Sequence, residues 1–302
     1  MLAYVRFKGY EALGTQSRAR YPGLIVFDLL RHRIRDCIPP SFLESDEATF
    51  GVICAKFGPM DRYALDPERS YRVEVEKTIL LIEDLITLGV KPIYLSSSYV
   101  FDGGVGYYTE DYPHSPVSAY GRNKAEVERF LQSRPQDTLA LRLDKIVGDD
   151  PSETHLFSEW YQWMTENRPI TCIEGQILSP TFVGDVAKGV VLSCQQGLSG
   201  LYNLANPEFF SRDELARQFA LALGTEPVIV CKPQAEFNFL DRRPLKSYLH
   251  STKFIKTTGM RFTSMREVFR AFRRRIQTGM ERGPDKSGRS NLSPTHECSD
   301  LS

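Results

Sequence analysis

The sequence has no excess of either charge, because 38 lysines and arginines balance 38 aspartates and glutamates over 302 residues. A basic patch or a basic balance is typical of proteins that bind nucleic acid or anionic membranes, and this composition offers neither. No apolar run approaches the roughly 20 residues that cross a bilayer. The first residues, MLAYVRFKGY, lack the basic start and long apolar stretch of a secretory signal. We therefore predict a cytoplasmic protein without nucleic-acid or membrane partners.

Cysteine is scarce and scattered in this chain. The six cysteines contain no C-x-x-C pair, so the sequence lacks the spacing of common zinc and redox motifs. Scattered cysteines without a secretory signal are typical of reduced thiols in a reducing compartment. We expect neither a disulfide framework nor a metal site. The cysteines are Cys37, Cys54, Cys172, Cys194, Cys231 and Cys298.

Short apolar runs alternate with helical patterns over most of the chain. The runs have the length and continuous apolar character of strands buried in a parallel sheet. Apolar residues at helical spacing predict helices over 71–88, 118–130 and 183–195. This alternation predicts an α/β protein with a doubly wound parallel sheet. The predicted strands are 24–28, 51–55, 92–96, 139–143 and 201–205.

The alternation is interrupted at residue 151, where a segment that holds both tryptophans begins. We predict a sheet domain over 1–150, to which 179–206 returns. Residues 151–178 and 207–278 are predicted to form a smaller C-terminal lobe over the carboxyl ends of the strands. Ligands of open α/β sheets bind at those ends, so this lobe is the predicted substrate lobe.

The C-terminal third contains recognisable helix ends. Ser211 is a predicted N-cap, with a glutamate three residues later, and Gly224 is predicted to end the same helix. The run Arg273–Arg275 is interpreted as cations at a helix C-terminus. The stretch 279–302 is polar and rich in glycine, serine and proline, which predicts a disordered tail.

The stretch SAYGRNK at 118–124 places Tyr120 and Lys124 four residues apart, on one face of a predicted helix. Ser97 lies at the carboxyl end of the preceding predicted strand, so the three side chains are expected to converge. An ammonium beside a phenol favours the phenolate, which would let Tyr120 exchange a proton with a carbonyl oxygen. Ser97 would hydrogen-bond the same oxygen, and a nicotinamide must supply the hydride. The simpler alternative is a tyrosine and a lysine on a solvated helix face.

Six stretches between residues 9 and 275 form a more specific pattern together than any one of them alone. As a set they resemble the extended short-chain dehydrogenases/reductases, most closely the dTDP-4-dehydrorhamnose reductases and their nucleotide-sugar relatives. The stretches are LSSSYVFDG (95–103), YTEDYPHSPVSAYGRNKAEVE (108–128), LRLDKIVG (141–148), SPTFVGDVA (179–187), GLYNLANPEFFSRDELA (200–216) and RRPLKSYL (242–249).

The resemblance implies a Rossmann-like dinucleotide-binding domain and an NADP(H)-dependent reductase of a 4-keto nucleotide sugar. A homodimer is among the assemblies it allows. The implied catalytic residues are Ser97, Tyr120 and Lys124. The implied cofactor-binding residues are Arg18, Asp28, Leu29, Ala55, Tyr120 and Lys124. The implied substrate-binding residues are Tyr99, Asp102 and Arg243, for which ordinary loop and surface roles remain an equal alternative.

The sequence departs from the family pattern at two positions near this set. Ser98 stands where an aspartate usually follows the catalytic residue, and Glu74 in RVEV stands where an asparagine is usual. Both departures leave the identity of the substrate open.

A third departure concerns the pyrophosphate site. No strand followed by G-x-x-G-x-x-G and a helix opens this sequence, although such a loop normally holds the pyrophosphate. In one interpretation, 9–20 corresponds to the second strand of the family and the first strand is absent. In the other, MLAYVRF is the first strand and Gly9 and Gly14 form a degenerate loop. Under the first interpretation we expect weak NADPH binding, slow turnover and reduced stability.

Cofactor choice is predicted from the residues that follow the expected strand EALGT. Arg18 and Arg20 lie there without an acidic neighbour, which suits the 2′-phosphate of NADP(H) better than the 2′-hydroxyl of NAD(H). Two other functions remain open. One is a non-catalytic, nucleotide-binding regulatory subunit of the same fold, as in methionine adenosyltransferase. The other is a nucleotide-sugar epimerase, against which the VFDG and RRP segments argue.

Overall fold

The computed structural model describes residues 1–17, 21–44 and 49–281. Helices and strands alternate along most of this length. In chain order they are α1 (Leu2–Phe7), β1 (Thr15–Gln16), β2 (Ile25–Val26), η1 (Ile34–Asp36), α2 (Pro40–Leu43), β3 (Phe50–Ile53), α3 (Met60–Leu65), α4 (Pro67–Tyr71), η2 (Arg72–Lys77), α5 (Thr78–Thr87), β4 (Lys91–Ser97), η3 (Ser98–Val100), α6 (Ala119–Gln132), β5 (Leu139–Leu143), β6 (Ile146–Val147), α7 (Leu156–Thr165), β7 (Ile170–Ile173), β8 (Ile177–Leu178), β9 (Thr181–Phe182), α8 (Val183–Gln195), β10 (Gly200–Asn203), β11 (Phe210–Ser211), α9 (Arg212–Leu223), β12 (Ile229–Lys232), η4 (Gln234–Glu236), α10 (Thr252–Thr258) and α11 (Met265–Glu281).

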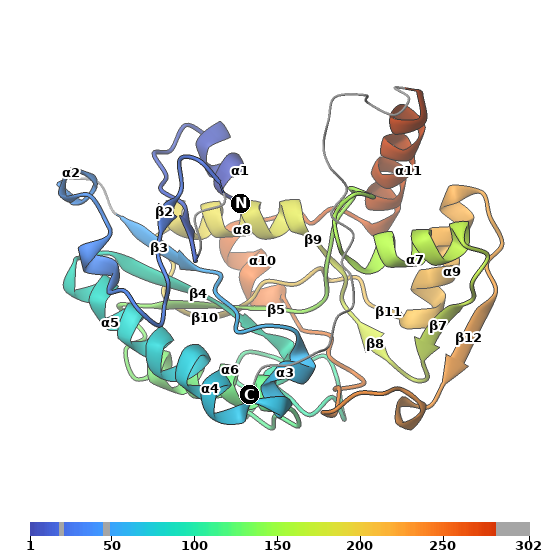
Figure 1. Cartoon of the computed structure of the whole chain (residues 1–302), viewed down its shortest axis with the longest axis horizontal. Helices are drawn as coiled ribbons and strands as arrows, with labels where there is room; N and C mark the ends of the chain where they lie inside the picture. Colours follow the sequence, from blue (N-terminus) through green and yellow to red (C-terminus); the bar gives the residue numbers. More distant parts are fainter. Residues whose placement is uncertain (18–20, 45–48, 282–302) are drawn as a thin grey trace, which may run out of the picture.

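A four-stranded parallel sheet in the order β10-β5-β4-β3 forms the centre of the fold. These strands coincide with four of the five predicted ones, and the predicted α/β class with a parallel sheet is confirmed. Consecutive strands are parallel, so each must be joined to the next by a crossover, and helices supply these crossovers. Figure 1 shows α5 and α6 on one side of the sheet and α8 on the other.

Alternate residues of the central strands face the two helical layers, because side chains along a strand point to opposite faces. Tyr94 packs with Val127 of α6 and residues of α5 in one hydrophobic cluster. Its neighbour Ile93 packs with Val190 of α8 and Phe254 of α10 in another. Burial on both faces explains why these strands read as continuous apolar runs.

The predicted helix 71–88 is part of a longer helical run. That run comprises α4, the π-helical segment η2 and α5, from Pro67 to Thr87. A π-helical turn holds an extra residue, so it rotates the side chains that follow relative to a regular helix. The apolar spacing of the sequence gave no sign of this segment, which contains Glu74.

The remaining predicted helices are confirmed. Helix α6 begins after Ser118, whose hydroxyl oxygen accepts a hydrogen bond from the N–H of Gly121 at 3.1 Å. Helix α8 has the predicted bounds. Helix α9 is capped by Ser211, which accepts from the N–H of Glu214, and ends at Gly224, whose φ of 81° is the left-handed conformation that glycine favours.

The N-terminal region contradicts one of the two interpretations of the sequence. MLAYVRF is not a strand, because residues Leu2–Phe7 form the short helix α1. Within the described residues 9–17 the only strand is β1, and it pairs in parallel with β2 to form a separate two-stranded sheet. The predicted strand 24–28 is therefore reduced to the two residues of β2. Strand β3 is left at one edge of the four-stranded sheet among the described residues.

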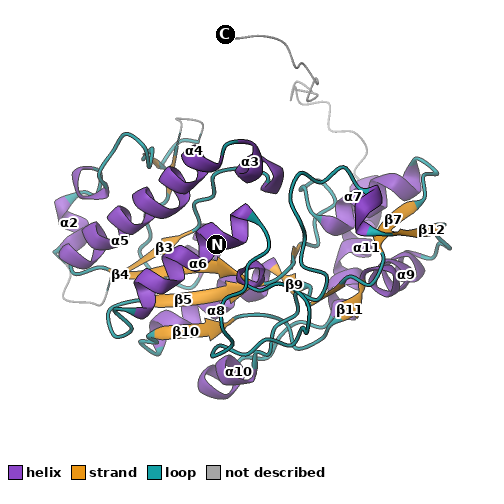
Figure 2. Ribbon diagram, turned by 90° about the horizontal axis from the view of Figure 1, so that it is seen from below, coloured by secondary structure: helices purple, strands orange, loops and turns teal. Residues whose placement is uncertain are grey.

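A second group of elements surrounds a separate hydrophobic cluster. Trp160 of α7, Cys172 of β7, Phe219 of α9 and Phe269 of α11 are all buried there. Figure 2 shows α7, α9, α11, β7 and β12 grouped at one end of the molecule, beyond the ends of the central strands. The boundaries drawn from the sequence at 150, 178 and 206 stay predictions.

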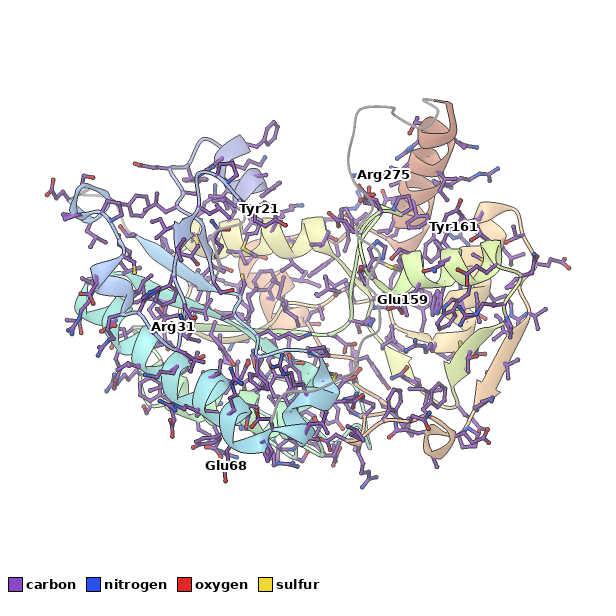
Figure 3. The ribbon with its side chains drawn as sticks, in the orientation of Figure 1. Tyr21, Arg31, Glu68, Glu159, Tyr161 and Arg275 are labelled. Carbon is purple, nitrogen blue, oxygen red and sulfur yellow. The ribbon has the colours of Figure 1, made fainter. Side chains whose placement is uncertain are left out.

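The C-terminal helix corrects two expectations. Helix α11 continues to Glu281, so the arginines at 273–275 lie within the helix and the assignment to its C-terminus is wrong. Arg275, which is labelled in Figure 3, forms ion pairs with Asp149 and Asp150 at 3.1 and 2.8 Å. The predicted tail began too early, because 279–281 are helical, and its remaining residues 282–302 lie outside the described part of the chain.

None of the helices in the described ranges combines the length and apolar character needed to cross a membrane. Five cysteines of those ranges are free thiols, namely Cys37, Cys54, Cys172, Cys194 and Cys231. Cys298 lies outside the described residues.

Candidate active site

The glycine of SAYGRNK brings the first turn of α6 against the end of β4. Strand β4 ends at Ser97 and continues into η3, which contains Tyr99. A β carbon on Gly121 would lie 2.0 Å from the carbonyl oxygen of Tyr99, so no larger residue permits this approach. Tyr120 and Lys124 are therefore carried on the helix that packs on the tip of β4.

Three side chains surround the ring of Tyr120. The rings of Tyr63 and Tyr99 meet it edge-on, at centroid distances of 5.2 and 5.8 Å. The Lys124 ammonium lies 5.7 Å from its centroid. Tyr120 is partly exposed, whereas Tyr63 is fully buried. The structure thus brings Tyr120 and Lys124 together, and their chemical roles stay predictions.

The three serines at the end of β4 have different partners. Ser96 donates a hydrogen bond to Glu128, and Ser98 donates one to Asp144 at 2.7 Å. The hydroxyl oxygen of Ser97 instead accepts from the N–H of Tyr99 at 3.2 Å. Among these three, Ser97 is the serine whose hydroxyl proton is not donated to a carboxylate, and its role toward a substrate oxygen stays a prediction.

Lys124 is buried and held by a carboxylate. Its ammonium lies 2.7 Å from Glu74 Oε1 and donates to the carbonyl oxygen of Leu95 at 3.3 Å. It also lies 4.6 Å from the centroid of the Tyr94 ring. Burial lowers the pKa of Lys124, but Tyr94 and the Glu74 carboxylate raise it by more, so that this pKa stands well above the usual lysine value. Lys124 therefore carries its charge at neutral pH.

Glu74 is a site residue that the sequence analysis treated only as a departure from the family pattern. It lies in the π-helical segment η2 and is 3% exposed. Its Oε2 accepts hydrogen bonds from the Tyr63 hydroxyl at 2.8 Å and from the Phe57 N–H at 3.0 Å. A charged residue between two valines in RVEV was the available signal, because an acid on an apolar helix face requires a buried partner.

Of the predicted substrate-binding residues, Tyr99 contacts Tyr120 edge-on. Burial, followed by the nearby Asp144 carboxylate, raises the pKa of Tyr99 to about 12. Arg243 pairs with Asp61 at 2.5 Å, and its Nη1 is buried without a partner among the described residues. Asp102 accepts from the Gly104 N–H and the Tyr108 hydroxyl, so it orders its own loop. Their roles toward a substrate stay predictions.

The predicted cofactor-binding residues of the N-terminal region are only partly described. Asp28 follows β2 and caps its own turn by accepting from the N–H of Leu30 at 2.9 Å. Leu29 packs at the margin of the cluster around Tyr94. Ala55 is exposed just beyond the end of β3. Arg18 lies outside the described residues, so its predicted contact with the cofactor stays a prediction.

Two cations that interact with each other, Lys145 and Arg212, were missed by the sequence analysis, and Arg212 also interacts with Tyr99. Burial, followed by the charge of Arg212, lowers the pKa of Lys145, and burial also lowers the pKa of Arg212. Arg212 donates to the Gln176 side chain at 3.0 Å, and its Nε is buried without a partner in the described ranges. Neither cation forms an ion pair with an acid among those residues, so an anionic group would be stabilised there. Nothing in their sequence spacing marks them, because they come from distant segments.

A family model described as the RmlD substrate binding domain matches residues 41–278. That span contains Glu74, Ser97, Tyr120 and Lys124.

Three relatives share parts of the sequence. The chain is 26% identical to the spore coat polysaccharide biosynthesis protein SpsK of Bacillus subtilis, over 73% of this chain and 77% of that protein. It is 25% identical to dTDP-4-dehydrorhamnose reductase of Aggregatibacter actinomycetemcomitans, over 73% and 79%. It is 27% identical to methionine adenosyltransferase 2 subunit beta of Xenopus tropicalis, over 57% and 54%.

Solved structures share the fold at lower identity. A hypothetical dTDP-4-dehydrorhamnose reductase from Sulfolobus tokodaii has a TM-score of 0.76 and 19% identity, over 87% of this chain and 92% of that one. The dTDP-4-dehydrorhamnose reductase of Bacillus anthracis in complex with NADP has a TM-score of 0.66 and 21% identity, over 73% of this chain and 78% of that one. UDP-glucose 4-epimerase of Thermus thermophilus in complex with NAD has a TM-score of 0.71 and 19% identity, over 91% and 94%. The Rossmann-like fold expected from the motifs is confirmed.

Proposed function

The chain belongs to the RmlD substrate-binding domain family of extended short-chain dehydrogenase/reductase-type proteins, and on that premise we propose that it reduces a 4-keto nucleotide sugar with NADPH. The observation that carries this proposal is the Tyr120–Lys124 pair at the end of β4, with the Lys124 ammonium 5.7 Å from the Tyr120 ring. A charged ammonium favours the phenolate form of a neighbouring tyrosine, and so prepares that tyrosine for proton exchange.

We propose that these residues would hold the nicotinamide end of the cofactor. An ammonium has three N–H donors. Glu74 and the Leu95 carbonyl accept two of those of Lys124, so one remains for a ribose hydroxyl. When bound, the nicotinamide supplies the hydride that no side chain can provide. Tyr120 would donate a proton to the carbonyl oxygen of the substrate, and Ser97 would hold that oxygen through its hydroxyl proton.

The test is consumption of NADPH in the presence of a dTDP-4-keto-6-deoxy sugar. We expect Tyr120→Phe to lower the rate by roughly 10²–10⁴-fold, the usual contribution of a positioned general acid. Tyr71→Phe is the matched control, because Tyr71 is an exposed tyrosine of α4. An unchanged rate in Tyr120→Phe would remove Tyr120 from the mechanism. Interconversion of sugars without net consumption of NADPH would identify an epimerase instead.

The preference for NADPH over NADH depends on Arg18. We expect calorimetric titration to give tighter binding of NADPH, and Arg18→Ala to abolish the difference by removing the charge proposed to bind the 2′-phosphate. Arg168→Ala, which changes an exposed arginine of the second group of elements, should keep the preference. Tighter binding of NADH by the unaltered protein would contradict this assignment.

A non-catalytic binding protein is the second candidate. The observation that favours it is the Glu74–Lys124 ion pair, because an ammonium held by a carboxylate influences Tyr120 less than a free one. The similarity to methionine adenosyltransferase 2 subunit beta agrees with this alternative. Binding of NADPH and of a nucleotide sugar by calorimetry, without any NADPH consumption, would favour it over the reductase.

A further inference from the structure

We propose that Glu74 is a positioning residue that fixes Lys124 and balances its charge beside Tyr120; this inference rests on the reductase function proposed above. It would make the Tyr120–Lys124 pair a group of three, in which the ammonium stands between a phenol and a carboxylate.

The position of Lys124 follows from its ion pair. The Lys124 and Glu74 side chains are 4% and 3% exposed, and their charged atoms are 2.7 Å apart. Water competes little at such a site, so the attraction is stronger than between exposed charges. The π-helical segment η2 carries Glu74 to this place, and π-helical turns are frequent at functional sites.

Glu74 also fixes the other side of Tyr120. Its second oxygen accepts from the Tyr63 hydroxyl and from the Phe57 N–H, at 2.8 and 3.0 Å. Tyr63 then packs edge-on against Tyr120, at a centroid distance of 5.2 Å. One carboxylate therefore connects η2 to α3, to the segment that follows β3 and to α6.

The charge balance follows from the groups that face Lys124. Besides Glu74 and Tyr120 these are Tyr63, Tyr94 and Cys54, and Tyr99 faces Tyr120 from η3. Burial raises the pKa of Tyr63, Tyr94, Tyr99 and Cys54, so all four are neutral near pH 7. Among the described residues Glu74 is then the carboxylate that offsets the ammonium. The Glu74–Lys124 ion pair is close to neutral as a whole. It therefore favours the phenolate of Tyr120 less than Lys124 alone would.

The test follows the ionisation of Tyr120 directly. Phenolate absorbance is titrated in each protein and in the same protein with Tyr120→Phe, and the difference reports Tyr120 alone. Glu74→Gln leaves Lys124 uncompensated, so we expect this ionisation to move to lower pH by about one unit or more, the usual effect of a close opposite charge. Glu76→Gln is the matched control, because Glu76 is an exposed residue of the same π-helical segment.

A second variant covers the case in which an uncompensated ammonium prevents folding. Glu74→Gln combined with Lys124→Met removes both charges, so the ionisation of Tyr120 should occur at nearly the wild-type pH. If Lys124 acted on Tyr120 without compensation by Glu74, Tyr120 would ionise at higher pH in the double variant than in the wild type. That result, or a Glu74→Gln titration identical to that of Glu76→Gln, would overturn the proposal.

The titration requires neither cofactor nor turnover, so it separates this inference from the proposed function. A shift without any reduction of keto sugars would support the role of Glu74 and contradict the reductase. In an active enzyme, the pH profile of reduction should move to lower pH in Glu74→Gln, which a purely structural role would not produce.

Discussion

Gly121 is the residue on which the geometry of the candidate site depends most directly. A β carbon at this position would meet the carbonyl oxygen of Tyr99 at 2.0 Å and the β carbon of Pro116 at 3.1 Å. The first of these contacts is with backbone, which cannot move aside as a side chain can. Glycine is therefore required at position 121 by the short distance between α6 and η3, and not by the backbone conformation of Gly121 itself.

We expect Gly121→Ala to lower the free energy of unfolding by roughly 1–3 kcal/mol, the usual cost of overpacking. It should also displace Tyr120 and lower any activity. Gly279→Ala is the control, because a β carbon there meets nothing within 4 Å in helix α11, and alanine stabilises a helix by up to about 1 kcal/mol relative to glycine. Chemical denaturation of both variants compares the two effects. If Gly121→Ala were as stable as Gly279→Ala, α6 would not be so closely packed on η3.

At the scale of elements, Glu128 of α6 and Arg142 of β5 join a helix to the sheet. Both side chains are fully buried, and Arg142 Nη2 lies 2.7 Å from Glu128 Oε2. Burial alone would raise the pKa of Glu128, but Arg142, with hydrogen bonds from His114 and Ser96, lowers it to about 2. The pKa of Glu128 is therefore lower in the folded chain than in the unfolded chain, where it is near 4.5.

This pKa difference predicts how stability depends on pH. The contribution of Glu128 is fully present above about pH 4.5 and is lost as the pH falls toward 2, because the unfolded state then binds a proton more readily. Its size is about 3 kcal/mol, since each pKa unit corresponds to about 1.4 kcal/mol. Denaturation curves recorded from pH 6 downward to about pH 2 measure this loss of stability.

Glu128→Gln should remove this pH dependence. It should also cost roughly 3–5 kcal/mol at neutral pH, because Arg142 would be left buried without its partner. Glu126→Gln, on the exposed side of the same helix, should retain the wild-type pH dependence. A Glu128→Gln variant that still loses stability like the wild type in acid would assign the effect to another group.

At the scale of the whole molecule, the hydrophobic clusters are divided between two regions. The clusters around Tyr94 and Ile93 cover the two faces of the central sheet, whereas the cluster around Phe219 lies among α7, α9 and α11. Both tryptophans of the chain belong to the latter, Trp160 at its centre and Trp163 at its margin. Tryptophan fluorescence therefore reports on the predicted substrate lobe, and far-UV circular dichroism reports on the whole chain.

We predict that the two regions unfold in separable steps. Phe219→Ala removes a buried ring and should cost roughly 3–5 kcal/mol, and Ile82→Ala should cost roughly 2–5 kcal/mol in the cluster around Tyr94. In urea, Phe219→Ala should shift the fluorescence transition much more than Ile82→Ala does. If both variants shift fluorescence and circular dichroism equally, the chain unfolds as one cooperative unit, and the proposed lobes are not independent.

Local patterns explain which parts of the fold were predicted correctly. Strands β4 and β5 are buried on both faces, so their apolar runs identify them without knowledge of their neighbours. Helix α9 was delimited by the side chain of Ser211 and the backbone of Gly224, which act within a few residues. The π-helical segment was not predicted, because the apolar positions of 71–88 also fit a regular helix. Only one of the two interpretations took helix α1 for a strand, and it was possible because six apolar and basic residues fit either structure.

The sequence by itself determined the alternation of the central strands and helices, the resemblance to the family, and the placement of Tyr120 and Lys124 on one helix after the strand that ends at Ser97. These features depend on residues close together in the chain, where spacing fixes which side chains share a face. The tertiary structure alone decided that one carboxylate oxygen of Glu74 pairs with Lys124 and that the other accepts hydrogen bonds from Tyr63 and Phe57. It also decided that the carbonyl oxygen of Tyr99 leaves no room for a side chain on Gly121. Such contacts join residues far apart in sequence, and they depend on how closely the elements pack, which no local pattern records.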